Sequence, residues 1–282
     1  MSPLASRVCI GSAFVLLSLG GWFCQRRGDE KTVVATRAPS PAAEMIVAGL
    51  GGFRGLVAEV IWFRADRLQD EGRYAELAQL SAWLTFLEPH TPEVWAYAAW
   101  NLSYNISVSM PTPQDRWRWV EAGIRLLRDD GLRLNPRDPV LYRELSWMFL
   151  LKLGGSLDEA GVYYRSEWKK KIEELRSSGR LSEVGFEESR MAAIDAEYGR
   201  QDWTDPLAAA LYWSALGLEL AKQDVHRREL RQVVYQALML EAGKDARFAP
   251  RALQELRTAY VEYPSDYLKM IIGKFRSRFG LD

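Results

Sequence analysis

Three acidic side chains in the first third of the chain have a spacing that suits acid–base chemistry. Glu59, Asp66 and Asp70 share one face of a predicted helix, because residues four and seven positions apart are neighbours on a helix surface. Neighbouring carboxylates can serve as general acid and general base in hydrolysis. The same pattern is typical of a solvated helix face or of a face that contacts a partner. We expect the second role for these residues.

The rest of the sequence offers few groups for catalysis or metal binding. No zinc-protease, CxxC, nucleophile-elbow, Walker or dinucleotide-binding motif occurs. The only cysteines are Cys9 and Cys24, and the only histidines are His90 and His226, so we predict no metal site and no cofactor. The 37 basic and 37 acidic residues balance, which argues against a nucleic-acid partner. We therefore expect that the protein is not an enzyme.

An uncharged segment lies near the amino terminus. Val8 to Cys24 is 17 residues long, which is the short end of the range for a membrane-spanning helix. The bulky Trp22 and Phe23 make a poor signal-peptide cleavage site. Residues 1–24 are therefore expected to be an uncleaved single-pass anchor, with a cleaved signal as the alternative. Residues 25–43 carry mixed charge and two prolines, which is typical of a linker.

The orientation of this anchor is set by the charges beside it. Arg7 precedes the apolar segment, whereas Arg26, Arg27 and Lys31 follow it. The count of basic residues favours a cytoplasmic body, but a short N-terminal anchor often keeps its tail inside the cell. We expect the body on the exported, periplasmic side of the cell membrane.

The body after the linker has the pattern of consecutive helical hairpins. Ile61, Trp62, Ala65 and Leu68 have helical spacing, and Gly72 ends that helix. A second apolar helix ends at Pro89, and Pro92 begins a third. Helix, glycine turn, helix and proline within about 34 residues is the pattern of a helical repeat.

Four landmarks fall in one register. With Pro89 at the closing position, Gly72 is the turn glycine, Tyr74 the aromatic residue after it, and Trp95 the tryptophan near the start of the next repeat. In these positions the chain resembles the tetratricopeptide-repeat (TPR) family, in a membrane-anchored bacterial form. The resemblance implies an all-α fold, an antiparallel helical-hairpin solenoid behind an N-terminal transmembrane helix.

The resemblance does not extend evenly along the chain. We assign TPR-like repeats to residues 44–156, an irregular helical insertion to 157–204, and C-terminal helices with one TPR-like repeat and a cap to 205–282. The second helix of the third repeat is expected to start near Leu157, and the helix at 185–198 to be exposed.

Smaller features give further expectations about the helices. Thr112 or Asp115 is expected to cap one helix, and Asp205 with Pro206 to begin another. The glycines at 51, 52 and 55 are expected to allow close helix packing.

The resemblance also implies a binding surface. In TPR domains the first helix of each hairpin lines a concave groove. The corresponding residues in the first repeat are Glu59, Trp62, Asp66, Gln69 and Asp70, those in the second are Glu93, Ala96, Trp100, Ser103 and Tyr104, and those in the third are Val140, Arg143, Trp147, Leu150 and Leu151. An aromatic ladder edged by carboxylates suits an extended or helical peptide.

Two interpretations of these tryptophans stay open. They can line a groove, or they can belong to a core covered by the insertion or the C-terminal helices. For function we expect a non-catalytic scaffold or adaptor that binds a protein or peptide through the concave face. The alternative is an enzyme, or a domain that binds a small molecule or glycan, with a Trp-lined cavity and Glu59, Asp66 or Asp70.

Overall fold

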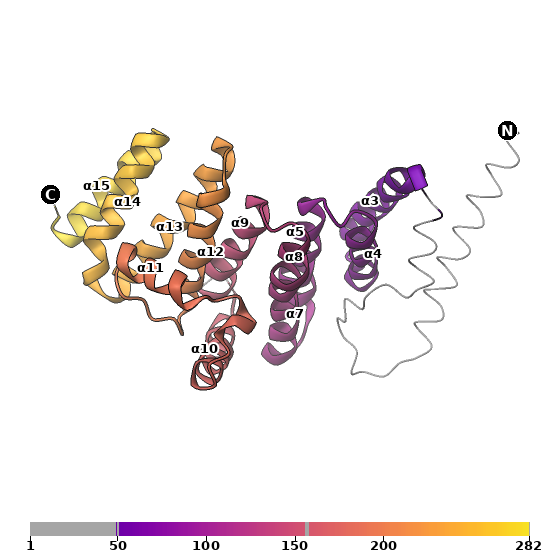
Figure 1. Ribbon diagram of the computed structural model, residues 1–282, viewed down its shortest axis with the longest axis horizontal. Helices are drawn as coiled ribbons and strands as arrows, with labels where there is room; N and C mark the ends of the chain where they lie inside the picture. The colour runs from indigo at the N-terminus through magenta and orange to yellow at the C-terminus, as the bar shows by residue number, and fades with distance from the viewer. Residues whose placement is uncertain (1–48, 50, 156–157, 282) are drawn as a thin grey trace, which may run out of the picture. The chain divides into compact units, whose positions relative to one another are not determined.

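The computed structural model describes residues 49, 51–155 and 158–281, and every regular element within them is a helix (Figure 1). The predicted all-α class is therefore confirmed. The principal helices are α3 (Arg54–Asp70), α4 (Tyr74–Leu87), α5 (Pro92–Trp100), α7 (Pro113–Arg125), α9 (Pro139–Trp147), α10 (Gly161–Ser177), α11 (Glu188–Tyr198), α12 (Pro206–Leu220), α13 (Asp224–Lys244), α14 (Ala249–Glu262) and α15 (Asp266–Phe279).

Short helical segments extend or join the principal helices. The π-helical segments are η2 (Asn101–Ile106), η3 (Leu126–Gly131) and η4 (Met148–Leu153). The remaining short segments are η1 (Gly51–Phe53), α6 (Ser107–Ser109), α8 (Leu132–Leu134), η5 (Leu181–Val184) and η6 (Ala246–Phe248). Residues 92–109, 113–134 and 139–153 are consequently three long helices, each with a π-helical part.

Local sequence explains where the helices begin. Thr112 Oγ1 accepts the Asp115 N–H at 3.1 Å, so Thr112 is the cap and Asp115 the capped residue. Asp205 accepts the Leu207 N–H at 3.0 Å, and Pro206 occupies the first turn of α12. Both predicted helix starts are confirmed.

The first hairpin consists of α3 and α4. Gly72 joins them with a φ of +68°, a left-handed conformation that glycine adopts without strain. Apolar side chains at helical spacing on α3 then face those of α4. The buried residues shared by this hairpin and the start of α5 are Ala58, Ile61, Leu84, Leu87 and Val94. The predicted positions of both helices are correct.

The partner of α9 differs from the sequence prediction. A helix starting near Leu157 was expected to pair with it, but α10 packs against α7 and η4, and α12 packs along α9. A Cβ at Gly217 of α12 would lie only 2.9 Å from Tyr142 Cβ on α9. The two helix backbones approach closely because α12 has a glycine at this crossing.

Residues between α10 and α12 contribute to the interior. The aromatic core, as we call it, consists of Phe149, Trp168, Phe186, Trp203 and Tyr212, all of them buried. Phe186 lies at its centre, with ring centroids 5.6 Å from Trp203 and 4.9 Å from Tyr212. The 157–204 segment therefore supplies core side chains. The expectation of an exposed helix at 185–198 was wrong, because α11 buries Met191, Ile194 and Tyr198.

The C-terminal helices pack consecutively. α12 lies against α13, α13 against α14, and α14 against α15. Ser265 caps α15 by accepting the Leu268 N–H at 3.2 Å. At the other end of the described chain, Gly51, Gly52 and Gly55 are exposed, and a Cβ at any of them would meet no atom within 4 Å. The expected close packing at these glycines was wrong.

None of the helices in the described residues is both long enough and apolar enough to cross a bilayer. The anchor predicted at residues 8–24 and the linker predicted at 25–43 lie outside the described part of the chain.

Candidate functional site

The predicted groove residues of α3 meet the next hairpin through an aromatic contact. Trp62 on α3 lies 4.7 Å from Tyr97 on α5, measured between ring centroids. The Tyr97 hydroxyl donates to Gln69 Oε1 at 3.3 Å. Burial raises the pKa of Tyr97, and the negative charge of Asp66 raises it further. Trp62, Asp66 and Gln69 therefore lie around one tyrosine.

A second aromatic pair lies further along the same helix. Trp100 is 39% exposed, and its ring stacks on that of Tyr104, with centroids 6.1 Å apart and planes 22° from parallel. From η4, Lys152 places Nζ 5.1 Å from the Tyr104 ring centroid, within the range of a cation–π contact. Burial and the negative charge of Glu144 raise the pKa of Tyr104.

The predicted groove residues of α9 have two different environments. Trp147 is half-buried and lies one helical turn after Glu144, the residue that influences Tyr104. Arg143 is half-buried; it donates to its neighbour Glu144 at 2.6 Å and to Glu229 of α13 at 2.7 Å. Its guanidinium is also 3.5 Å from His226 Nδ1. Arg143 is therefore a structural contact between α9 and α13.

We use the name tryptophan face for the pair Trp62 and Tyr97, the pair Trp100 and Tyr104, and the half-buried Trp147 of α9. Of the two interpretations left open by the sequence, neither applies to every residue. None of the three tryptophans is fully buried, but Ser103, Val140 and Leu150 are buried and do not line an open surface. Glu59, Asp66 and Asp70 are exposed along α3, so carboxylates border the face on that side.

Lys152 is held in place by a buried polar cluster. Its Nζ donates to Asp158 Oδ2 at 2.6 Å, and the Tyr164 hydroxyl donates to the same oxygen at 3.1 Å. Burial lowers the pKa of Lys152. Burial alone would raise the pKa of Asp158, but hydrogen bonds from Lys152, the Ala160 N–H and Tyr164 hold it below its usual value. The contact with Asp158 fixes Lys152 beside Tyr104.

Two π-helical segments position these groups. The helix with Trp100 becomes π-helical at Asn101, and the helix with Trp147 becomes π-helical at Met148. A π turn widens the helix and shifts the side chains that follow it, and such turns are frequent at functional sites. Here the two segments present Tyr104 and Lys152 to each other.

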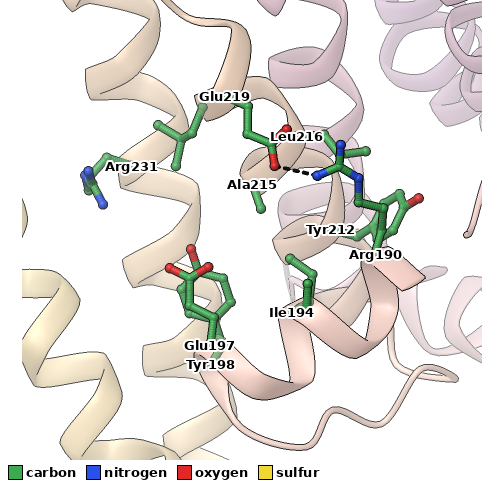
Figure 2. Close-up of a pocket in the computed structure, with 11 residues that line it drawn as sticks. Arg190, Ile194, Glu197, Tyr198, Tyr212, Ala215, Leu216, Glu219 and Arg231 are labelled. Atoms are coloured by element: carbon green, nitrogen blue, oxygen red, sulfur yellow. Dashed lines mark hydrogen bonds and ion pairs between the residues drawn. The ribbon is translucent and has the colours of Figure 1, made fainter. Parts of the chain in front are cut away.

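A separate cavity of about 310 Å³ lies between α11, α12 and α13 (Figure 2). Arg190 donates to Glu219 at 2.7 Å across its mouth, and Tyr198, Tyr212 and Arg231 also line it. Its lining contains no tryptophan and none of the carboxylates on α3. This cavity is therefore not the Trp-lined cavity that the alternative function requires.

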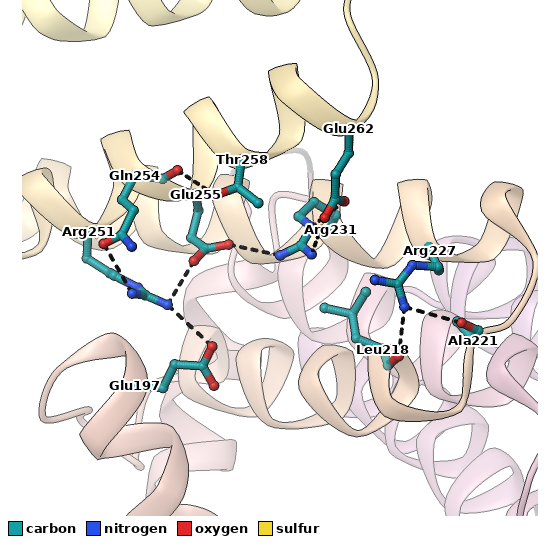
Figure 3. A network of polar contacts seen from close by, with 10 residues as sticks. All are labelled: Glu197, Leu218, Ala221, Arg227, Arg231, Arg251, Gln254, Glu255, Thr258 and Glu262. Atoms are coloured by element: carbon teal, nitrogen blue, oxygen red, sulfur yellow. Dashed lines mark hydrogen bonds and ion pairs between the residues drawn. The ribbon is translucent and has the colours of Figure 1, made fainter.

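The cationic groups near this cavity are engaged in ion pairs (Figure 3). Arg231 donates to Glu255 at 3.2 Å and to Glu262 at 2.8 Å. Arg251 lies 3.3 Å from Glu197 and 2.8 Å from Glu255. The network ties α11 and α13 to α14, which indicates a structural role.

The described residues contain no group of three or more His, Cys, Asp and Glu side chains that could hold a metal ion. No protein-family model, no curated protein and no solved structure matches this chain. The candidate site is therefore chosen for its own geometry, and we place it on the tryptophan face.

Two residues of this site were absent from the prediction. The TPR register carried Ala96 into the groove, whereas its neighbour Tyr97 makes the contact with Trp62. Lys152 lies in a π-helical segment whose shifted register a regular repeat does not contain. The spacing of Tyr97, Trp100 and Tyr104 at three and four residues was a signal for the first of these.

Proposed function

We propose that this protein is a non-catalytic, membrane-anchored scaffold that binds a protein segment through the tryptophan face. Its body is a TPR-like solenoid in this proposal. The four hairpins are α3 with α4, α5 with α7, α9 with α12, and α13 with α14. The packing of α4 on α5 and of α12 on α13 supports this assignment, because consecutive hairpins of a solenoid contact only their neighbours.

The observation that carries the proposal is the exposure of Trp100 beside Tyr104. An exposed tryptophan stacked on a half-buried tyrosine leaves a large apolar surface in contact with water, which is typical of binding surfaces. Tryptophan and tyrosine are also the residues that most often dominate the free energy of binding at interfaces.

The charges around the face indicate the chemistry of the partner. The border on α3 is acidic, whereas Arg143 and Lys152 are engaged with Glu229 and Asp158. A peptide with apolar anchors and lysine or arginine residues fits this arrangement. A peptide carboxylate would find no unpaired cation at either of these positions.

The experiment is affinity capture of the full chain from membranes, followed by mass spectrometry. The test variant is Trp62→Ala/Trp100→Ala/Trp147→Ala, and the matched control is Val162→Ala/Val261→Ala, which removes exposed apolar side chains from α10 and α14. We expect a specific protein to be lost with the test variant and kept with the control. Circular dichroism checks that both variants are folded.

Capture of the same proteins by wild type and the folded test variant would contradict the proposal. It would leave the catalytic or glycan-binding alternative. In that case Glu59, Asp66 and Asp70 would be the candidate catalytic or ligand-binding residues.

We also propose that residues 8–24 anchor the protein in the cell membrane with the body on the periplasmic side. The uncharged sequence of that segment supports the anchor. Protease added to intact spheroplasts is expected to digest the body, whereas a body that is digested only after lysis would place it in the cytoplasm.

A further inference from the structure

The first described helix has an apolar stripe that no other described helix covers. Phe53, Leu56, Val60 and Phe63 are 66%, 59%, 55% and 71% exposed. Leu56, Val60 and Phe63 lie on one side of α3 because they are four and three residues apart, and Phe53, the last residue of η1, precedes them by three residues. The opposite side carries Ala58, Ile61, Ala65 and Leu68, which are buried. The helix is therefore apolar on two opposite sides, of which only one is packed.

The packing of equivalent helices shows what is missing. α5 lies between α4 and α7, and α13 lies between α12 and α14. Among the described residues, α3 packs against α4 and also touches α5 through Trp62 and Tyr97, and its exposed stripe faces away from both. A helix on the stripe would give α3 the same surroundings as α5 and α13.

We propose that the stripe pairs with the stripe of a second copy of this chain, with the two α3 helices parallel. Phe53 and Val60 occupy the first position of a heptad and Leu56 and Phe63 the fourth, which are the contact positions of a two-stranded coiled coil. All four are exposed, so two copies can bury them against each other without rearrangement of the hairpin.

The charges beside the stripe select the parallel orientation. Glu59 lies on one flank and Arg64 on the other, five residues later in the sequence. Glu59 occupies the seventh position of the heptad, and Arg64 the fifth position of the next heptad. In a parallel pair a residue at the seventh position faces the residue five positions later on the partner. Glu59 of each copy therefore meets Arg64 of the other, twice per dimer. In an antiparallel pair the flank with Glu59 would face the same flank of the other copy, and the flank with Arg64 would do likewise. Like charges would then face each other.

Arg64 is available for this contact. Its intramolecular neighbour is Glu76 at 3.8 Å, and both side chains are nearly half exposed, so that ion pair contributes little to stability. Arg67, in the next turn, occupies the following first position of the heptad, where it faces Arg67 of the second copy with Asp66 of that copy beside it.

Other occupants fit these charges less well. Residues 8–24 carry no charge and cannot pair with Glu59 and Arg64. An anionic lipid surface would meet the carboxylates of Glu59, Asp66 and Asp70 on one flank. A second copy supplies both signs in register, and a shared membrane would keep both amino termini on one side.

The first test is disulfide cross-linking of the purified full chain in detergent micelles. The background is Cys9→Ser/Cys24→Ser, which removes both native cysteines. Single cysteines are then introduced by Val60→Cys and Arg67→Cys, with Val261→Cys on α14 as an exposed control. A parallel pair brings equal residues together at both α3 positions, so both variants are expected to cross-link at least about tenfold faster than the control.

The result that would overturn the parallel pair is cross-linking of Arg67→Cys at the rate of the control. An antiparallel pair gives that result, because residue 67 then lies far from its own copy. Binding of the stripe to lipid or to residues 8–24 also gives it.

The second test exchanges the charges. Glu59→Arg and Arg64→Glu are each expected to raise the dimer dissociation constant about threefold to tenfold, measured by sedimentation equilibrium. The double variant Glu59→Arg/Arg64→Glu is expected to restore it, and Glu76→Gln is expected to leave it unchanged. A double variant as weak as the single variants would refute the predicted Glu59–Arg64 contact.

Discussion

The tryptophan face and the aromatic core use the same residue types in opposite surroundings. On the face, Trp100 has a tyrosine on one side and solvent on the other. In the core, Trp168 and Trp203 are enclosed by Phe149, Phe186 and Tyr212. A tryptophan count therefore does not distinguish binding from folding. The helices packed around each side chain make that distinction.

The comparison predicts its largest effect in the aromatic core. Trp168→Ala is expected to lower the free energy of unfolding by about 4 kcal/mol, because it removes a fully buried ring and leaves a cavity. Urea denaturation followed by circular dichroism measures the change. A loss below about 1 kcal/mol would mean that α10 does not pack as described.

A somewhat smaller loss is expected beneath the tryptophan face. Lys152→Ala leaves the buried Asp158 carboxylate without its principal cation, at a cost of about 3 kcal/mol. Lys152→Met retains most of the side-chain volume, and comparison of the two separates lost charge from lost packing. Equal stability of wild type and both variants would show that the buried pair does not hold η4 in place.

Glu241, a buried residue of α13, makes the free energy of unfolding depend on pH. Burial raises its pKa to about 8, and the nearby Asp205 adds to the effect. A glutamate in the unfolded chain ionises near 4.5, so between pH 4.5 and 8 the folded state binds the extra proton. The free energy of unfolding therefore falls as the pH rises through this window, by about 1.4 kcal/mol for each pH unit, and is level above it.

Glu241→Gln tests this directly, because the amide does not ionise. Its unfolding free energy is expected to vary less than that of wild type between pH 5 and 8.5, whereas the exposed control Glu183→Gln keeps the wild-type slope. Parallel slopes for wild type and Glu241→Gln would contradict the raised pKa.

The smallest effect on stability is expected on the tryptophan face itself. Trp100→Ala removes a side chain that is already 39% exposed, so the free energy of unfolding should change by less than about 1 kcal/mol. The same urea titration provides the comparison with Trp168→Ala. A loss as large as that of Trp168→Ala would place Trp100 in the core.

Much of the fold followed from local sequence. Gly72, Thr112 and Asp205 mark helix ends through backbone conformation and side-chain caps, which depend on a few adjacent residues. The partner of α9 could not be predicted this way. It is chosen by packing between residues 75 positions apart, where Gly217 on α12 leaves room for Tyr142 on α9. The intervening α10 is also helical, so local sequence does not distinguish the two candidates.

The candidate site was predictable in part for the same reason. Trp62, Asp66 and Gln69 were predicted on one face of a regular helix, and in the structure they lie around Tyr97, which the prediction did not include. Arg143 was expected to line the groove, but its partner Glu229 lies 86 residues away on α13. The π-helical segments moved Lys152 to Tyr104 by a change of register that helical periodicity does not contain.

The most direct test of the tryptophan face is photo-crosslinking in living cells. A photoreactive amino acid replaces Trp100 in the full chain, and a second strain carries it at Val261, an exposed site on α14. A discrete crosslinked protein from position 100, absent at position 261, is the predicted result. Identical products from both positions, or none from position 100 while the protein is folded and in the membrane, would contradict the assignment of this face as the binding site.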